Sequence, residues 1–409
     1  MASHTPTESA PESDYRTVTP AGFAVPPAEA TDVCVADNIL AERGLLDART
    51  RGVVIDRLAR ELAPNPSASR RDLFFKLSTA REGIGFLVAL RDDLLRGRGE
   101  HSSWGAVEAD LTQVLEGAFS RDLLDFRRID WTTPAPLLEK LTRHEAVHAI
   151  RDWRDLRRRL DADRRCYALF HPGWPEEPLI FTELALTRGL SANMQPLLDP
   201  DSPVLDAGSC DGATFYSISS CQPGLRGFAL GNALISRVVD QLRVELPRLR
   251  TFATLSPIPG FRSWLSGLAS PVDGASEVGA LTAALDRPGW FEDARASAEL
   301  EAALMPLCAR YLLHVRQGGE PADPVARFHL GNGARLRRVN WLSDVSPEGL
   351  RRSAGLTANY VYHPTDRQRN LRAYATGRRI AASRELERLS RLAPRYAAEA
   401  GGVRPLAGV

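Results

Sequence analysis

The sequence predicts an α+β protein in which a helical N-terminal domain precedes a domain of alternating strands and helices. Three observations predict this class. Apolar residues recur at helical spacing from about residue 36 to 165, with few β-branched runs between them. Short apolar runs bounded by Pro and Gly begin at Cys166 and are typical of buried strands. Amphipathic segments then separate further short apolar runs, which is the pattern of a mixed fold.

Composition and periodicity divide the chain into three segments. Residues 1–34 are rich in Pro, Ser, Thr, Ala and Glu and lack apolar periodicity, so we expect a disordered leader there. Residues 35–165 are expected to form the helical domain, because apolar positions within 54–62 and within 84–95 share single helical faces. Residues 166–409 are expected to form the α+β domain.

Each element of the second domain is predicted from its apolar pattern and its boundaries. The expected strands are 166–170, 179–186, 214–219, 252–255 and 358–362. The expected helices are 230–246, 275–316, 346–355 and 367–399. The segments 171–178 and 318–324 carry Pro and Gly and are expected to be a turn and a loop.

Composition also excludes several classes of function. The 409 residues carry 52 basic and 51 acidic side chains, a net charge of +1, whereas binding to nucleic acid or a membrane surface normally needs a basic excess. No apolar run of about 18 residues occurs. The five cysteines form no CxxC pair, which argues against a zinc ribbon or a disulfide framework. We therefore expect a cytoplasmic protein that binds neither nucleic acid nor membrane.

The basic residues are almost all arginine. Only Lys76 and Lys140 are lysines, so a mechanism that uses an amine nucleophile has two candidates. Codon bias explains the imbalance without any functional requirement.

Two short motifs are weighed against plain structural interpretations. His144–His148 spells HExxH, which binds zinc when both histidines share a helix face, but a third ligand at zincin spacing is absent. Val204–Gly212 resembles a methyltransferase glycine loop, but Cys210 replaces the middle glycine and a strand-like segment follows. A surface or inter-domain helix is the favoured interpretation of the first motif, and a tight loop is that of the second. We expect no metal site.

The glycine-bearing loop Cys221–Gly227 lies between a predicted strand and a long amphipathic helix. Backbone N–H groups at such a junction converge on an anion, and the helix N-terminus adds partial positive charge. Arg226 is a candidate for a charge-assisted bond to phosphate. The alternative is an ordinary strand-to-helix turn.

Several longer blocks, spread through residues 144–362, resemble the malonyl-CoA decarboxylase family and occur in its order. The blocks are Asp163–Pro172, Glu177–Ile180, Phe215–Gly227, Leu255–Phe261, Arg327–Ala334, Asn340–Asp344 and Ala358–Tyr362. The N-terminal half matches more loosely, and the leader does not match. The family's block around Glu145–His148 lacks both the first histidine and a metal, so the resemblance implies no zinc.

The resemblance implies a catalytic domain with the GNAT acetyltransferase fold, in which the loop before the main helix binds the CoA pyrophosphate. The CoA-binding residues carried over are Gly224, Leu225, Arg226, Gly227, Phe228, Ala229, Leu230, Gly231 and Asn232. Two positions depart from the pattern. Cys221 stands where acetyltransferases have a basic residue or Gln, and Ala229 replaces an acidic residue of some relatives, so any contact of that acid is absent here.

The family's catalytic serine falls on Ser256 and its catalytic histidine on His329, while Tyr362 stands where the family has a tyrosine near the substrate. The resemblance therefore implies decarboxylation of malonyl-CoA to acetyl-CoA and CO2. Ser256 is expected to position the malonyl group, and His329 is expected to protonate the enolate.

Further expectations follow from the same resemblance. The thioester is the electron sink, so no metal or organic cofactor is expected, and the family's homotetramer is the expected assembly. Three alternatives stay open: a GNAT-type acyltransferase, a methylmalonyl-CoA decarboxylase, and a CoA-binding regulator without activity.

Overall fold

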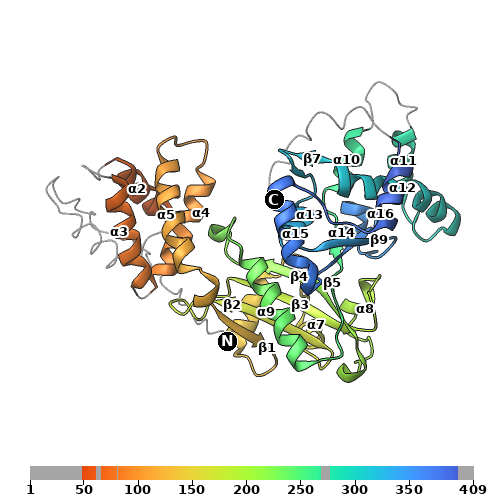
Figure 1. Ribbon diagram of the computed structural model, residues 1–409, viewed down its shortest axis with the longest axis horizontal. Coiled ribbons are helices and arrows are strands. Elements are labelled where there is room, and N and C mark those ends of the chain that lie inside the picture. The colour runs from red at the N-terminus through yellow and green to blue at the C-terminus, as the bar shows by residue number, and fades with distance from the viewer. Residues whose placement is uncertain (1–47, 61–65, 81, 269–276, 395–409) are drawn as a thin grey trace, which may run out of the picture.

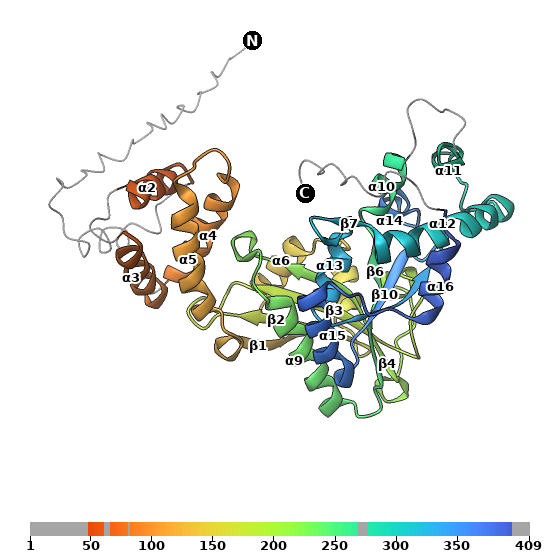
Figure 2. The same ribbon diagram turned by 45° about the horizontal axis from the view of Figure 1, so that its top comes forward.

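The structure, a computed structural model, describes residues 48–60, 66–80, 82–268 and 277–394. Figure 1 shows a helical part beside a larger part built around one sheet, and Figure 2 shows the same two parts from a tilted direction. The predicted α+β class is confirmed. The leader expected over 1–34 lies outside the described residues.

The helical part buries most of the apolar positions that the spacing predicted; Leu95 is half-buried, and Leu62 lies outside the described residues. It consists of α2 (Ala48–Arg60), α3 (Pro66–Thr79), α4 (Gly83–Arg96) and α5 (Trp104–Ala118). Ile55, Phe74, Leu87 and Leu111, one from each helix, are fully buried in a common core. Amphipathic helices of this length owe most of their stability to such packing.

The larger part contains one eight-stranded sheet. Its strands are β1 (Asp125–Ile129), β2 (Arg164–Phe170), β3 (Ile180–Thr187), β4 (Gly212–Ser220), β5 (Thr251–Thr254), β6 (Ser256–Pro257), β9 (Arg335–Asn340) and β10 (Thr357–Val361). Their order is β1-β2-β3-β4-β5-β10-β6, with β9 also paired to β10. Neighbours are antiparallel except β4 and β5, which run parallel.

The remaining elements cover or flank this sheet. They are α6 (Ala135–His144), α7 (Trp153–Arg159), α8 (Gln195–Leu198), α9 (Leu230–Glu245), α10 (Phe261–Leu268), α11 (Glu277–Leu285), α12 (Ala294–His314), β7 (Arg316–Gln317), β8 (Glu320–Pro321), α13 (Pro324–Gly331), α14 (Pro347–Ser353), α15 (Pro364–Gly377) and α16 (Arg384–Leu392). Among the described helices, none is long and apolar enough to cross a membrane.

Both faces of the central strands are buried, which explains their continuous apolar sequence. On β2, Tyr167 and Leu169 pack into the core shared with α9, while Ala168 and Phe170 pack into the core shared with α6 and α7. Alternate strand residues point to opposite faces, so a strand covered on both sides has no polar face.

Strands β4 and β5 separate part-way along their length. They pair in parallel only from Gly212 opposite Thr251 to Phe215 opposite Thr254. Beyond this point β4 continues to Ser220 alongside β3, whereas the chain after β5 turns into β6 and pairs with β10. The separation leaves the end of β4 without a neighbour on one side, and a cavity lies there.

Several predicted elements differ from the structure. The region expected to be all-helical over 35–165 also contains β1 and the start of β2, which pair with each other in the sheet, and its later helices α6 and α7 pack beside that sheet. The single terminal helix expected over 367–399 is two helices, α15 and α16. Arg378, which has φ 50°, ends the first of them. The sequence analysis also missed α13 and β9.

The HExxH segment lacks the helical geometry of a zinc-binding motif. Helix α6 ends at His144, so His144 and His148 do not share a helix face. Glu145 is buried, and its carboxylate accepts hydrogen bonds from the N–H groups of Val147 and His148 and from the Ser217 hydroxyl. The expectation of a surface or inter-domain helix over this block is therefore wrong, because α6 ends at His144 and the residues that follow form no helix; Glu145 is buried, whereas Ala146 is exposed.

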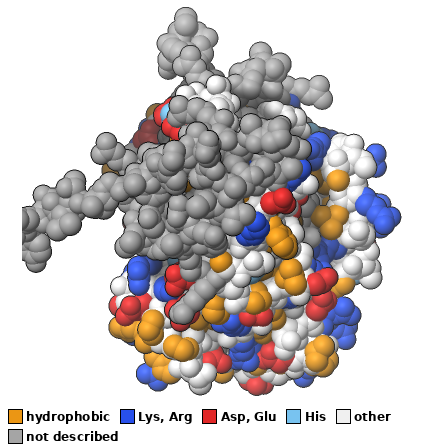
Figure 3. Space-filling view, turned by 90° about the vertical axis from the view of Figure 1, so that its left-hand side faces the viewer, with side chains coloured by type: hydrophobic (Ala, Val, Ile, Leu, Met, Phe, Trp, Pro, Cys, Tyr) orange, Lys and Arg blue, Asp and Glu red, His pale blue; other side chains and the backbone are white. Residues whose placement is uncertain are grey.

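A group of buried ions lies between α7 and the sheet. The Arg159 guanidinium contacts Asp155 at 3.0 Å and Glu183 at 2.7 Å, and all three side chains are at most 3% exposed. Arg158 binds Asp163 through both nitrogens of its fork. By contrast, the face in Figure 3 intersperses basic and acidic side chains where side chains are described. A buried carboxylate such as that of Glu183 is stable as an ion only when a cationic side chain pairs with it.

We expect Arg159→Met to destabilise the protein by about 3–5 kcal/mol, because it leaves Glu183 buried without its positive partner. Urea denaturation measures the change. The control is Arg143→Met on α6, which removes an ion pair with Glu139 whose arginine is 71% exposed. The control is expected to leave the midpoint unchanged. Equal midpoints for the two variants would contradict the expectation.

Candidate active site

A cavity of about 200 Å³ lies where β4 and β5 separate. Its lining residues are Val147, Phe215, Tyr216, Ser217, Ile218, Thr254, Ser256, Pro257, Pro324, Val325, Phe328 and His329. None of these described lining residues is a Lys, Arg, Asp or Glu. The cavity is therefore apolar apart from a few hydroxyls and one imidazole.

Ser256 and His329 meet inside this cavity, although 73 positions separate them in the chain. The Ser256 hydroxyl lies 2.9 Å from His329 Nε2 and donates a hydrogen bond to Thr254 Oγ1 at 2.8 Å. β6 positions Ser256 by pairing it with Ala358 of β10. Helix α13 carries His329. Its capping residue, Asp323, accepts the Ala326 N–H, and Pro324 follows at the first helical position.

Tyr362 completes a chain of hydrogen bonds through the imidazole. Its hydroxyl lies 2.8 Å from His329 Nδ1. Because Ser256 gives its single proton to Thr254, it accepts from His329 Nε2–H. Nδ1 then has no proton and accepts from Tyr362. The pattern assigns His329 the neutral Nε2–H tautomer, with Tyr360 stacked on the ring at 4.6 Å between centroids.

Burial keeps the side chains of His329 and Tyr362 uncharged. Complete burial lowers the pKa of His329 from 6.5 to about 3, and burial raises the pKa of Tyr362 well above its usual value. Both groups are therefore neutral near pH 7. Uncharged side chains are stable beside an apolar cavity, where an uncompensated charge costs free energy.

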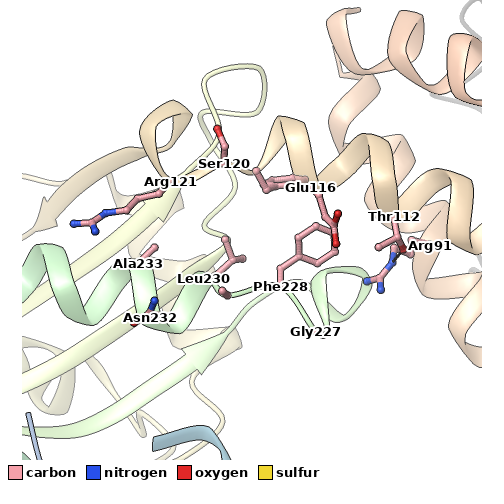
Figure 4. A pocket seen from close by; sticks show the side chains of 12 residues that line it. Arg91, Thr112, Glu116, Ser120, Arg121, Gly227, Phe228, Leu230, Asn232 and Ala233 are labelled. Atoms are coloured by element: carbon pink, nitrogen blue, oxygen red, sulfur yellow. Dashed lines mark hydrogen bonds between the residues drawn. The ribbon is translucent and has the colours of Figure 1, made fainter. Parts of the chain in front are cut away.

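A second cavity, of about 460 Å³, lies at the N-terminus of α9. Figure 4 shows side chains from α4 and α5 on one side, residues of α9 on another, and Phe228 between them. The lining residues are Arg91, Thr112, Glu116, Phe119, Ser120, Arg121, Gly227, Phe228, Ala229, Leu230, Asn232 and Ala233. Ala229, the N-cap of α9, has no side chain that accepts a hydrogen bond from the helix. The first N–H groups of α9 therefore have no acceptor within the helix.

Only some of the nine predicted CoA-binding residues line the second cavity. Those that line the second cavity are Gly227, Phe228, Ala229, Leu230 and Asn232. Gly224 and Leu225 are buried against the helical part and the core, and the Arg226 side chain is exposed and does not line the cavity. The phosphate contact predicted for Arg226 stays a prediction. Gly227 has φ 95°, a conformation that favours glycine.

Gly231 also permits a close contact between two helices. A Cβ at this position would lie 2.4 Å from Cζ of Phe328, so the glycine permits close packing of α9 on α13. Phe328 precedes His329 and lines the first cavity. The close approach therefore links the N-terminus of α9 to the helix that carries the imidazole.

Sequence reasoning missed three residues that shape the two cavities. Thr254 accepts a hydrogen bond from the Ser256 hydroxyl. Ser217 lines the first cavity and donates a hydrogen bond to Glu145. Arg91 extends from α4 to line the second cavity. A signal existed for Thr254, since positions 254 and 256 alternate as strand neighbours do. The other two depend on contacts between distant segments, which spacing does not reveal.

Comparison with known proteins identifies a consistent set of relatives. Two family models match, the malonyl-CoA decarboxylase N-terminal domain at residues 49–119 and the C-terminal domain at residues 122–400. A mitochondrial malonyl-CoA decarboxylase of Anser anser anser is 38% identical over 343 residues, which are 77% of this chain and 68% of that protein.

Solved structures agree with the sequence relatives. The malonyl-CoA decarboxylase of Agrobacterium vitis superposes with a TM-score of 0.78 at 38% identity, over 88% of this chain and 95% of that one. The enzyme of Rhodopseudomonas palustris gives 0.77 at 38% identity, over 88% and 96%. The resemblance inferred from the sequence blocks is confirmed.

We expect Gly231→Ala to destabilise the protein by about 1–3 kcal/mol, because the added methyl forces Phe328 or α9 to move. Alanine otherwise favours a helix over glycine, so the sign of the change is diagnostic. The control is Gly267→Ala in α10, where a Cβ meets nothing within 4 Å. Urea denaturation should show a loss for the first variant and no loss for the second. Stabilisation by Gly231→Ala would refute the close-packing role.

Proposed function

The chain belongs to the malonyl-CoA decarboxylase family, and from this premise we propose that it converts malonyl-CoA to acetyl-CoA and CO2 with Ser256 and His329 as catalytic residues. The observation that carries the proposal is the hydrogen bond between these two side chains inside an otherwise apolar cavity. The cavity would hold the malonyl group.

The lining of the cavity favours loss of CO2. A malonyl carboxylate placed there meets no cationic side chain among the described lining residues. Its charge is therefore poorly stabilised, whereas CO2 is neutral and tolerates an apolar environment. As the bond to the carboxylate breaks, its electron pair moves into the thioester, which becomes an enolate.

Ser256 and His329 would divide the remaining tasks. The Ser256 hydroxyl would leave Thr254 and donate to the malonyl thioester, which fixes the geometry of the breaking bond and stabilises the enolate oxygen. His329 would deliver its Nε2 proton to the α-carbon. A thioester enolate carbon is more basic than the imidazolate that a neutral imidazole becomes on losing this proton, so no imidazolium is needed.

Tyr362 would keep the imidazole neutral during this transfer. As Nε2 loses its proton, Nδ1 takes one from the Tyr362 hydroxyl at 2.8 Å. When acetyl-CoA has left, the Nδ1 proton returns to the Tyr362 oxygen and Nε2 takes up one solvent proton, which restores the starting Nε2–H tautomer. The balance is one malonyl-CoA carboxylate and one solvent proton consumed for one CO2 and one acetyl-CoA released.

The CoA portion of the substrate would occupy the second cavity. Its diphosphate would accept hydrogen bonds from the first N–H groups of α9, which have no acceptor within the helix. The contact between Gly231 and Phe328 puts this helix end next to the wall of the acyl cavity.

Three features of the enzyme remain proposals. The thioester accepts the electron pair itself, so the reaction should need no metal and no organic cofactor. The assembly should be a homotetramer, which light scattering tests. Its location should be the cytoplasm. The curated relatives that match are named as mitochondrial, so fractionation of cells is the test of location.

Purified protein should release CO2 and acetyl-CoA from malonyl-CoA in the presence of a chelator and without an acyl acceptor. A rate that requires an added amine or thiol would favour an acyltransferase. Faster turnover of methylmalonyl-CoA would favour that substrate. Binding of CoA without either product would favour a regulator.

We expect His329→Asn to lower kcat about 10²–10⁴-fold with little change in KM, because a positioned proton donor is lost. Ser256→Ala should lower kcat about 10²–10³-fold, as for loss of one donor to an oxyanion. Stopped assays of CO2 release measure both. A rate near that of the unchanged protein would remove the substituted residue from its role.

The pH dependence of kcat tests the neutral imidazole. With a pKa lowered to about 3 by burial, His329 stays neutral as the pH falls from about 8 to 5.5. If the neutral form is active, kcat should be flat over this range. A loss of activity with a midpoint near the ordinary histidine pKa of 6.5 would contradict this account.

A further inference from the structure

Arg91 of α4 joins the helical part to the loop before α9. Its Nη1 donates to the carbonyl oxygens of Gly224 at 2.6 Å and Arg226 at 2.9 Å, although more than 130 positions separate them in the chain. On its other side, Arg91 pairs with Glu108 of α5 at 3.0 Å and donates to Thr112. The side chain is almost fully buried, and the geometry is that of a fixed guanidinium fork.

The loop backbone itself lies against α4. A Cβ at Gly224 would be 2.0 Å from the carbonyl oxygen of Val88, so only glycine permits this contact. The Arg91 guanidinium also lies 4.9 Å from the centre of the Phe228 ring, and both residues line the cavity at the N-terminus of α9. Figure 4 shows Phe228 between Arg91 and the labelled residues of α9.

These contacts have an electrostatic consequence for an anionic ligand. Carbonyl oxygens carry partial negative charge and repel a diphosphate. Arg91 binds two of them, which neutralises their charge and fixes the path of the loop. The loop then leads directly into the helix whose first N–H groups would bind the diphosphate.

We infer that Arg91 is a positioning residue for the CoA diphosphate, so that the helical part completes the CoA site of the α+β part. The inference rests on the proposed function, because it assigns the ligand of the second cavity. Arg91 acts through the loop backbone and touches no reacting atom. Its substitution should therefore weaken binding of the nucleotide end of the substrate and leave the chemical step alone.

The test compares Arg91→Met with the unchanged protein on two substrates, malonyl-CoA and malonyl-pantetheine, which lacks the adenosine diphosphate. With malonyl-CoA we expect KM to rise about tenfold or more and kcat to change less than about threefold. With malonyl-pantetheine we expect the two proteins to have the same kcat/KM. Arg91→Lys keeps one donor and the charge, so its KM should be intermediate.

The matched control is Arg70→Met, which breaks a buried ion pair with Asp110 inside the helical part and does not touch the loop. It should destabilise the helical part while leaving KM for malonyl-CoA unchanged. An unchanged KM for Arg91→Met overturns the inference. An equal loss on both substrates also overturns it, because a general structural defect would act that way. If the unchanged protein releases no CO2, the proposed function fails first.

Discussion

The rest of the site depends on the buried imidazole of His329, which is hydrogen-bonded on both nitrogens. One bond reaches Ser256 on β6, and the other reaches Tyr362 just beyond β10. The imidazole can make both only if α13 lies against the sheet at one depth and one rotation. Burial keeps the ring neutral, and neutrality gives each nitrogen a single role, one as donor and one as acceptor.

The fold supplies this environment by separating strands that would otherwise pair. β4 and β5 pair over four residues and then diverge, and the acyl cavity lies in the gap. The same divergence brings Thr254 and Ser256 to the cavity wall. Arg159 and Glu183, which are paired directly, are not among the described residues that line it. The same sheet therefore contains both buried ions and an apolar cavity, because the ions bind one another and none of them lines the cavity.

The sequence predicted the elements whose patterns are strong and local. β2, β3 and β4 are continuous apolar runs because both of their faces are buried, and α9 has a regular apolar face. β1 escaped prediction because Asp125–Ile129 contains two arginines and becomes a strand only by pairing with β2. α13 escaped because it has eight residues, although Asp323 and Pro324 carry a helix-start signature.

Local sequence patterns predicted less of the site than of the fold, because the site is made by contacts between distant segments. Ser256 and His329 came from a family resemblance, since nothing in their spacing brings together two residues so far apart. The family resemblance places the glycines of the CoA loop at the phosphates, and that contact stays a prediction. In the structure Gly224 and Gly231 also allow close packing against Val88 and Phe328. The role of Arg91 was invisible because it consists entirely of contacts between the two parts of the molecule.

The protonation state of His329 is the central claim, and nitrogen-15 NMR of histidine-labelled protein measures it directly. Comparison with His329→Asn assigns the signal. Near neutral pH the account predicts a neutral imidazole with its proton on Nε2 and an unprotonated Nδ1 that accepts from Tyr362. An imidazolium signal, or a proton on Nδ1, would contradict the hydrogen-bond chain and the mechanism built on it.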